Sequence, residues 1–195
     1  MSAAALDASM DLRFLGVVVG SKKYLAKAAQ RLRERFGVLH VRELPWPSLR
    51  VLLAEEALRV DAHLACLIVD AKSALARLSE AFPRSSRRVL RECLAEALWS
   101  ILWNRHLSPL GVVEIHACRD VAWIVRHARE VRVVVCTKGC LSGLADPVAW
   151  SVQRAERGAK RRPSRELLGR VRVENVSRDV FVLAKALARR RSSRA

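Results

Sequence analysis

The chain has 195 residues, of which 51% are hydrophobic, and its 36 lysines and arginines against 19 acidic residues give a net charge of +17. This length and composition suit one folded domain with a proper core and exclude a disordered chain. Because no apolar run approaches the roughly 20 residues of a membrane span and the first residues lack a signal-peptide pattern, we expect an intracellular, cytoplasmic protein.

In chain order, the N-terminal half alternates between strands and helices. Residues 12–20 are short, β-branched and bounded by glycine, which predicts a strand. The helical spacing of apolar residues predicts an amphipathic helix over 22–36, and a second helix is predicted over 48–60. The unbroken apolar run at 63–70 is typical of a strand that is buried on both faces.

The second half continues this alternation and contains the most regular helical pattern in the chain, at 85–106. The predicted elements after residue 70 are helices over 71–81, 85–106, 120–130 and 142–158, and strands over 111–117 and 131–137.

Strands that alternate with helices predict an α/β domain whose central sheet of about five strands is flanked by helices. The segment around Asp7 lies close enough to the strand at 12–20 to form a hairpin, so we expect a mixed sheet. We assign this domain to residues 1–156. Residues 157–195 are predicted to be a basic C-terminal extension that forms loops, an amphipathic helix or tails ordered only on binding.

Four carboxylates stand where apolar runs break: Asp7, Glu43, Asp70 and Asp146. Sites in parallel α/β sheets form at the carboxyl ends of strands, and Asp70 directly follows a predicted strand while Asp146 lies near a helix start. Converging carboxylates select hard cations such as Mg²⁺ or Mn²⁺, which can activate water for attack on a phosphodiester. For any one of these acids, the alternative is a solvated or helix-capping residue at a strand end.

The order of these acids resembles the ribonuclease H-like superfamily, and more narrowly a branch known mainly as a domain of unknown function. The resemblance spans roughly residues 5–156 and is carried by Asp7-Ala8-Ser9, Leu15-Gly16-Val17-Val18-Val19, His40 with Glu43, Ile68-Val69-Asp70-Ala71-Lys72, and Leu144-Ala145-Asp146-Pro147-Val148-Ala149-Trp150. It implies a ribonuclease H-like fold and a metal-dependent nuclease in which Asp7, Asp70 and Asp146 hold Mg²⁺ or Mn²⁺ and Glu43 completes the catalytic set.

The chain departs from the pattern of that branch at two points. Ala8 replaces its second acid, and Glu43 is followed by Leu-Pro-Trp-Pro where the branch runs into a histidine. An alternative function is therefore a non-catalytic module that binds nucleic acid, or associates with ribonucleoproteins, on a degenerate nuclease fold.

The positive charge favours RNA or DNA as the partner over an acidic protein or a membrane surface, although a genome biased toward arginine would also raise it. The predicted nucleic-acid contacts are Lys138, Arg154, Arg157, Lys160, Arg161, Arg162, Arg189, Arg190 and Arg191.

Two further patterns are weaker. Glu114 and His116 alternate along a predicted strand, so they share a face and form either a ligand pair or, as we favour, a satisfied polar edge. Cys136 and Cys140 lack the second pair that a structural zinc site needs, so no zinc site is expected.

Overall fold

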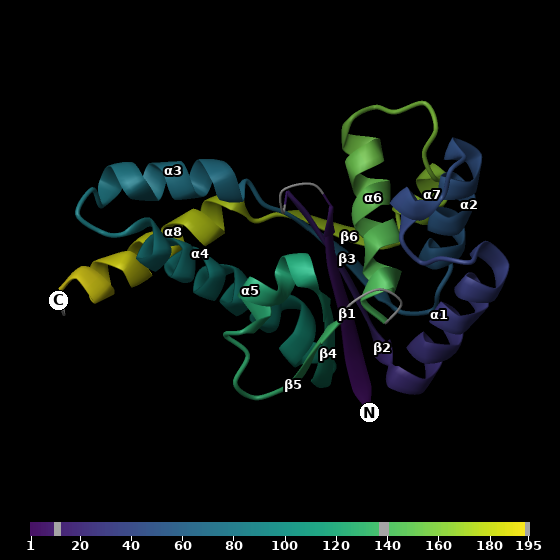
Figure 1. Cartoon of the computed structure of the whole chain (residues 1–195), viewed down its shortest axis with the longest axis horizontal. Coiled ribbons are helices and arrows are strands. Elements are labelled where there is room, and N and C mark those ends of the chain that lie inside the picture. The colour runs from purple at the N-terminus through teal and green to yellow at the C-terminus, as the bar shows by residue number, and fades with distance from the viewer. Residues whose placement is uncertain (10–12, 137–140, 194–195) are drawn as a thin grey trace.

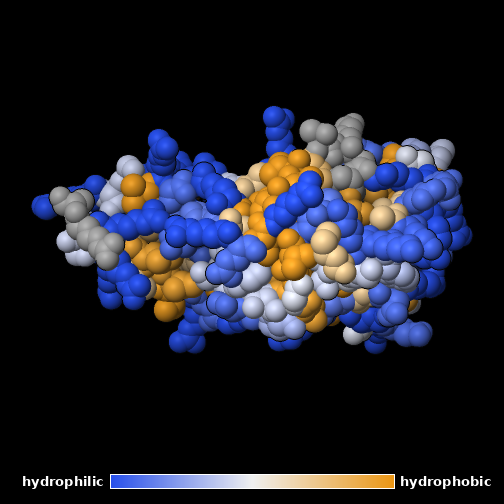
Figure 2. All heavy atoms as spheres, turned by 90° about the horizontal axis from the view of Figure 1, so that it is seen from below, coloured by the Kyte–Doolittle hydropathy of each residue, from blue (hydrophilic) through white to orange (hydrophobic). Residues whose placement is uncertain are grey.

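A computed structural model describes residues 1–9, 13–136 and 141–193 of the chain. In these residues a mixed six-stranded sheet lies between two layers of helices (Figure 1). Every helix in the described ranges is too short or too polar to cross a lipid bilayer. The surface seen in Figure 2 is mostly hydrophilic around a smaller hydrophobic area, in line with the high content of lysine and arginine.

The strand order in the sheet is β5-β4-β1-β2-β3-β6. Neighbouring strands are antiparallel in the pairs β1–β2 and β2–β3, and parallel in β1–β4, β4–β5 and β3–β6. The strands are β1 (Ser2–Ser9), β2 (Phe14–Ser21), β3 (His63–Ile68), β4 (Val112–Cys118), β5 (Arg132–Cys136) and β6 (Val171–Asn175). The predicted α/β class, the N-terminal hairpin and the mixed sheet are thus confirmed, with six strands in place of about five.

Helices cover both faces of the sheet because alternate residues of its central strands are apolar on both sides. In β1, Ala4 and Leu6 belong to one hydrophobic cluster, whereas Ala3 and Ala5 belong to the other. One layer contains α1 (Lys22–Phe36), α2 (Pro47–Leu58), α6 (Ala145–Glu156) and α7 (Arg165–Leu168), and the other contains α3 (Ala71–Ala81), α4 (Arg87–Leu102), α5 (Ala122–Val125) and α8 (Ser177–Ser192) (Figure 1).

The segment predicted to be a basic C-terminal extension is part of this architecture. Strand β6 pairs with β3 along five residues, and α8 packs against α4. Helix α8 buries Val180, Ala184 and Ala188, which recur every four residues and so form one narrow apolar stripe. This stripe consists of small side chains between many arginines, so the sequence indicated it only weakly. The predicted boundary at residue 156 therefore does not separate a tail from the folded domain.

Close packing at Gly16 fixes the position of α6. Gly16 lies in β2 opposite Asp7 of β1, and a Cβ atom built on it would lie 2.2 Å from the carbonyl oxygen of Ala145. The first turn of α6 therefore rests directly on the backbone of β2, a contact that only glycine permits. This contact brings the N-terminal end of α6 to the strand that carries Asp7.

Replacing Gly16 by alanine should therefore strongly destabilise the protein. The obstacle is backbone, which cannot move aside as a flexible side chain can, so we expect Gly16→Ala to lower the free energy of unfolding by about 3 kcal/mol or more. Gly20→Ala in the same strand is the matched control, because its nearest contact is the side chain of Leu25 at 3.3 Å. Urea unfolding of both variants measures the difference, and equal losses would contradict this account of the packing.

Candidate metal centre

Asp7 is buried near the carboxyl end of the central strand β1, with 4% of its surface exposed. Its Oδ1 accepts a hydrogen bond from the backbone N–H of Ala8 at 2.8 Å. Its Oδ2 is also buried and accepts no hydrogen bond of regular geometry from the described residues, although Nδ1 of His40 lies 3.5 Å away and the Cys118 thiol lies beside the carboxylate. Burying a carboxylate oxygen without a partner lowers the stability of the folded state. We therefore expect a cation or a proton to bind at this atom.

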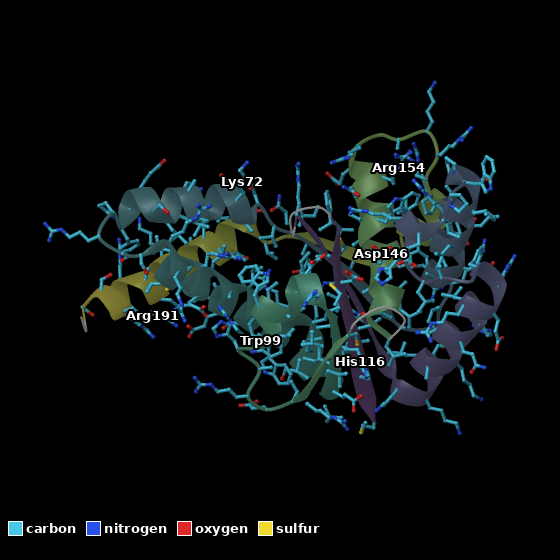
Figure 3. All side chains as sticks on the ribbon, in the orientation of Figure 1. Lys72, Trp99, His116, Asp146, Arg154 and Arg191 are labelled. Atoms are coloured by element: carbon cyan, nitrogen blue, oxygen red, sulfur yellow. The ribbon has the colours of Figure 1, made fainter. Side chains whose placement is uncertain are left out.

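Asp146 lies in the first turn of α6, where Pro147 follows it without disrupting the helix. Only 6% of its surface is exposed. Its Oδ2 accepts a hydrogen bond of 2.7 Å from the backbone N–H of Val41, which ties α6 to the segment between α1 and α2. Figure 3 shows Asp146 in the middle of the molecule, next to the sheet.

His40 completes a group of three possible metal ligands with Asp7 and Asp146. It immediately precedes a short 3₁₀ turn at Val41–Glu43, and its Nδ1 lies 3.5 Å from Oδ2 of Asp7. One ligand atom from each of the three residues lies within 4.8 Å of the other two. This geometry can hold one divalent cation between two carboxylates and an imidazole.

Burial dominates the electrostatics of the acidic pair. It raises the pKa of Asp7 to about 6, while the nearby Cys118 thiol lowers this pKa, Asp146 raises it and His40 lowers it. Burial also raises the pKa of Asp146, against the opposing effect of the hydrogen bond from Val41. Burial next to Asp7 raises the pKa of Cys118 to about 12, so its thiol stays protonated. Burial therefore outweighs the favourable interactions that the described residues offer these two carboxylates.

The three residues open into a cavity of about 420 Å³, here called the acidic cavity. Glu43 is exposed and contributes to the lining of this cavity, so the structure brings Glu43 into the neighbourhood of Asp7 and Asp146. Arg42, Arg119 and Asp120 also line it. The acidic cavity thus combines buried carboxylates with exposed side chains of both signs.

The fourth predicted acid, Asp70, lies elsewhere. It is the N-cap of α3, where its Oδ1 accepts a 3.0 Å hydrogen bond from the backbone N–H of Ser73. It is exposed and lines a separate cavity together with Arg13, Arg77 and Ser177. The geometry matches the helix-capping alternative, and Asp70 is not part of the group formed by Asp7, His40 and Asp146.

The predicted nucleic-acid contacts in the described residues lie away from Asp146. Arg154 is in the last turn of α6 and donates a hydrogen bond to the carbonyl of Arg161, whereas Asp146 is in the first turn. Arg191, near the end of α8, forms an ion pair with Glu96. Figure 3 shows Arg191 at the opposite side of the molecule from Asp146, and Arg154 at the other end of α6. Lys138 and Cys140 lie outside the described residues.

Glu114 and His116 are buried in β4, one strand inside the edge of the sheet. Glu114 forms an ion pair of 2.7 Å with Lys22, and its Oε1 lies 2.6 Å from Nε2 of His116. These contacts lower the pKa of Glu114, with the hydrogen bond from Lys22 as the largest cause. The pair is satisfied internally, as favoured from the sequence, although it is buried and not at an edge.

Sequence reasoning placed His40 in a matching motif but did not assign it as a ligand. The signal was present, because His40 stands three residues before Glu43. The position of Cys118 beside Asp7 could not be predicted, since its apolar surroundings in the sequence resemble those of any buried cysteine.

No known protein family, curated protein or solved structure matches the chain.

Replacing Asp7 by asparagine should stabilise the cation-free protein at neutral pH. Because the pKa of Asp7 in the folded state lies above the ordinary value of 3.8 for this side chain, the folded protein binds more protons and loses stability as pH rises through this window. The shift is equivalent to about 3 kcal/mol at neutral pH, so we expect Asp7→Asn to gain about 2 kcal/mol near pH 7.5 and little near pH 3.5.

Chemical unfolding in the presence of EDTA across this pH range measures the effect. The matched control is Asp61→Asn, which removes an exposed acid that lies outside the acidic cavity. A loss of stability in Asp7→Asn near neutral pH, with the control unchanged, would contradict an uncompensated buried charge at Asp7.

Proposed function

We propose that the chain is a metal-dependent nuclease with a ribonuclease H-like fold that acts on RNA or DNA. The proposal rests above all on the buried Oδ2 of Asp7, which accepts no hydrogen bond from the described residues and lies among the ligand atoms of His40 and Asp146. The mixed sheet supports the fold assignment. An acid on the first strand and another at the start of a late helix is the arrangement that the sequence resemblance implies.

The donor set narrows the choice of cation. Carboxylates suit Mg²⁺ and Mn²⁺, whereas an imidazole ligand favours a softer ion than Mg²⁺, so we propose Mn²⁺ held by Asp7, His40 and Asp146. When bound, such an ion polarises a phosphoryl oxygen and lowers the pKa of a water molecule. Among the described residues, two carboxylates belong to the ligand group, and this small number favours a single ion over a two-metal site.

The remaining residues of the acidic cavity suit the other needs of phosphodiester hydrolysis. The exposed carboxylate of Glu43 can accept a proton from an attacking water molecule. Arg42 and Arg119 are exposed in the lining of the same cavity and can hold the phosphate oxygens of a substrate.

The second candidate is the non-catalytic module that binds nucleic acid. Two observations favour it, because Ala8 stands where the resembling branch has a second acid and Asp70 serves as a helix cap. Such a protein would bind RNA or DNA without cleaving it.

A cleavage assay on single-stranded and duplex RNA and DNA, with Mn²⁺ or Mg²⁺, separates the two candidates. We expect cleavage in Mn²⁺ by the wild-type protein and a loss on the order of 100-fold or more in Asp146→Asn, because a direct ligand is removed. Asp70→Asn is the matched control and should keep its activity within about twofold, since asparagine caps helices as well as aspartate does.

Undiminished cleavage by Asp146→Asn would overturn the site assignment. Binding without cleavage by the wild-type protein, with both ions and all four substrates, would favour the non-catalytic module.

A further inference from the structure

A second cavity, of about 970 Å³, lies beside the acidic cavity, and its lining is dominated by positive charge. Five basic side chains from four separate parts of the chain line it, against one acid, Asp120. We call it the basic groove, and its basic residues are Arg42, Lys72, Arg87, Arg91 and Arg119. All five are exposed, so their charged groups are available to a ligand.

Several arginines elsewhere in the fold are held by carboxylates. Arg105 pairs with Glu174 and Asp179, and Arg126 pairs with Glu92. Within the described residues, by contrast, no carboxylate lies within ion-pair distance of the five basic side chains of the groove. The groove therefore concentrates positive charge that the fold does not use for its own stability, which is the electrostatic footprint of a polyanion site.

Apolar side chains lie among these charges. Leu75 of α3, Leu94 of α4 and Trp123 of α5 line the groove together with Ala8 and Ala71. Trp123 is half-buried, and the guanidinium carbon of Arg91 lies 5.9 Å from the centroid of its ring. Apolar and aromatic surface between basic groups accommodates unstacked bases next to their phosphates.

The basic groove is continuous with the acidic cavity. The two cavities share four lining residues: Ala8, Arg42, Arg119 and Asp120. Ala8 directly follows Asp7 in β1. Figure 3 shows Lys72 at the end of α3 that adjoins the sheet. The charge of Lys72 therefore lies at the end of α3 nearer to Asp146.

We propose that the basic groove binds single-stranded nucleic acid and leads the strand to Asp7 and Asp146. This inference rests on the proposed nuclease function and specifies its substrate as an unpaired strand. Phosphates contact Lys72, Arg87 and Arg119, while a base packs on Trp123. A duplex would keep its bases stacked inside and leave the apolar lining unused, whereas a single strand uses both parts of the groove.

Fluorescence anisotropy with labelled oligo-dT and oligo-U of about 15 nucleotides, in EDTA, tests the location of the site without requiring cleavage. The groove variant is Lys72→Ala/Arg87→Ala/Arg119→Ala. The matched control is Lys23→Ala/Lys27→Ala/Arg31→Ala, which removes the same number of exposed lysines and arginines from α1, on the other face of the sheet.

We expect the groove variant to bind at least about tenfold more weakly, with the slope of log affinity against log salt reduced by about 2, because each phosphate contact on a single strand contributes about 0.7. The control variant should change neither quantity appreciably. An unchanged affinity and slope in the groove variant, or an equal loss in the control, would overturn the proposal.

Two further arms test the single-strand assignment. Trp123→Leu keeps an apolar side chain but removes the aromatic ring, and it should weaken binding of the single strand by about tenfold. A duplex of equal length should bind more weakly than the single strand to the wild-type protein. Equal or tighter binding of the duplex would overturn the assignment, as would an unchanged affinity in Trp123→Leu.

These outcomes are distinguishable from failure of the nuclease proposal. Groove-dependent binding of single strands without cleavage in Mn²⁺ would support the groove and overturn the nuclease function. Cleavage that depends on Asp146 but is unaffected by the groove variant would support the nuclease function and overturn the groove.

Discussion

The candidate site depends on the contact between the backbone of Gly16 and the first turn of α6. Gly16 is the register partner of Asp7, and its missing Cβ lets the carbonyl of Ala145 approach β2 directly. One close packing point therefore places the acid of the first strand and the acid of α6 next to each other, although 139 positions separate Asp7 from Asp146 in the sequence (146 − 7). The hydrogen bond from Val41 to Asp146 then adds the segment that carries His40.

Two carboxylates held in this way destabilise the fold unless something neutralises them. Burial raises the pKa of both, which means that the protein favours their protonated forms more than water does. The cost is tolerated because the sheet and both helix layers supply a large apolar core on either side of β1. Titratable groups whose pKa is shifted by burial inside a cavity are concentrated at functional sites. Oδ2 of Asp7, which accepts no hydrogen bond from the residues that the structure describes, provides a geometric reason to assign such a site here.

Much of the fold could be predicted because its strongest signals are local. Helix α4 buries Leu90, Leu94 and Leu98 as its spacing indicates, and the apolar run of β3 is a central strand. Asp70 shows where local reasoning stops, since the same position after a strand serves a ligand or a helix cap equally well. A ligand and a helix cap can be told apart only by whether the acid lies near Asp7 and Asp146 in the folded protein. The position of these two acids depends on the packing of α6, and no local sequence pattern indicates it.

The C-terminal segment shows why a count of basic residues in a sequence window is a poor guide to a binding surface. Arg170 donates hydrogen bonds to the carbonyls of Leu58, the last residue of α2, and of Val60, and Arg191 joins α8 to α4 through Glu96. These arginines satisfy orphan carbonyls and carboxylates of the fold itself. The basic side chains that remain unpaired around a concave, partly apolar surface are instead spread over Arg42, α3, α4 and Arg119. Because no window of the sequence contains them together, only the fold reveals that their charges converge beside the buried acids.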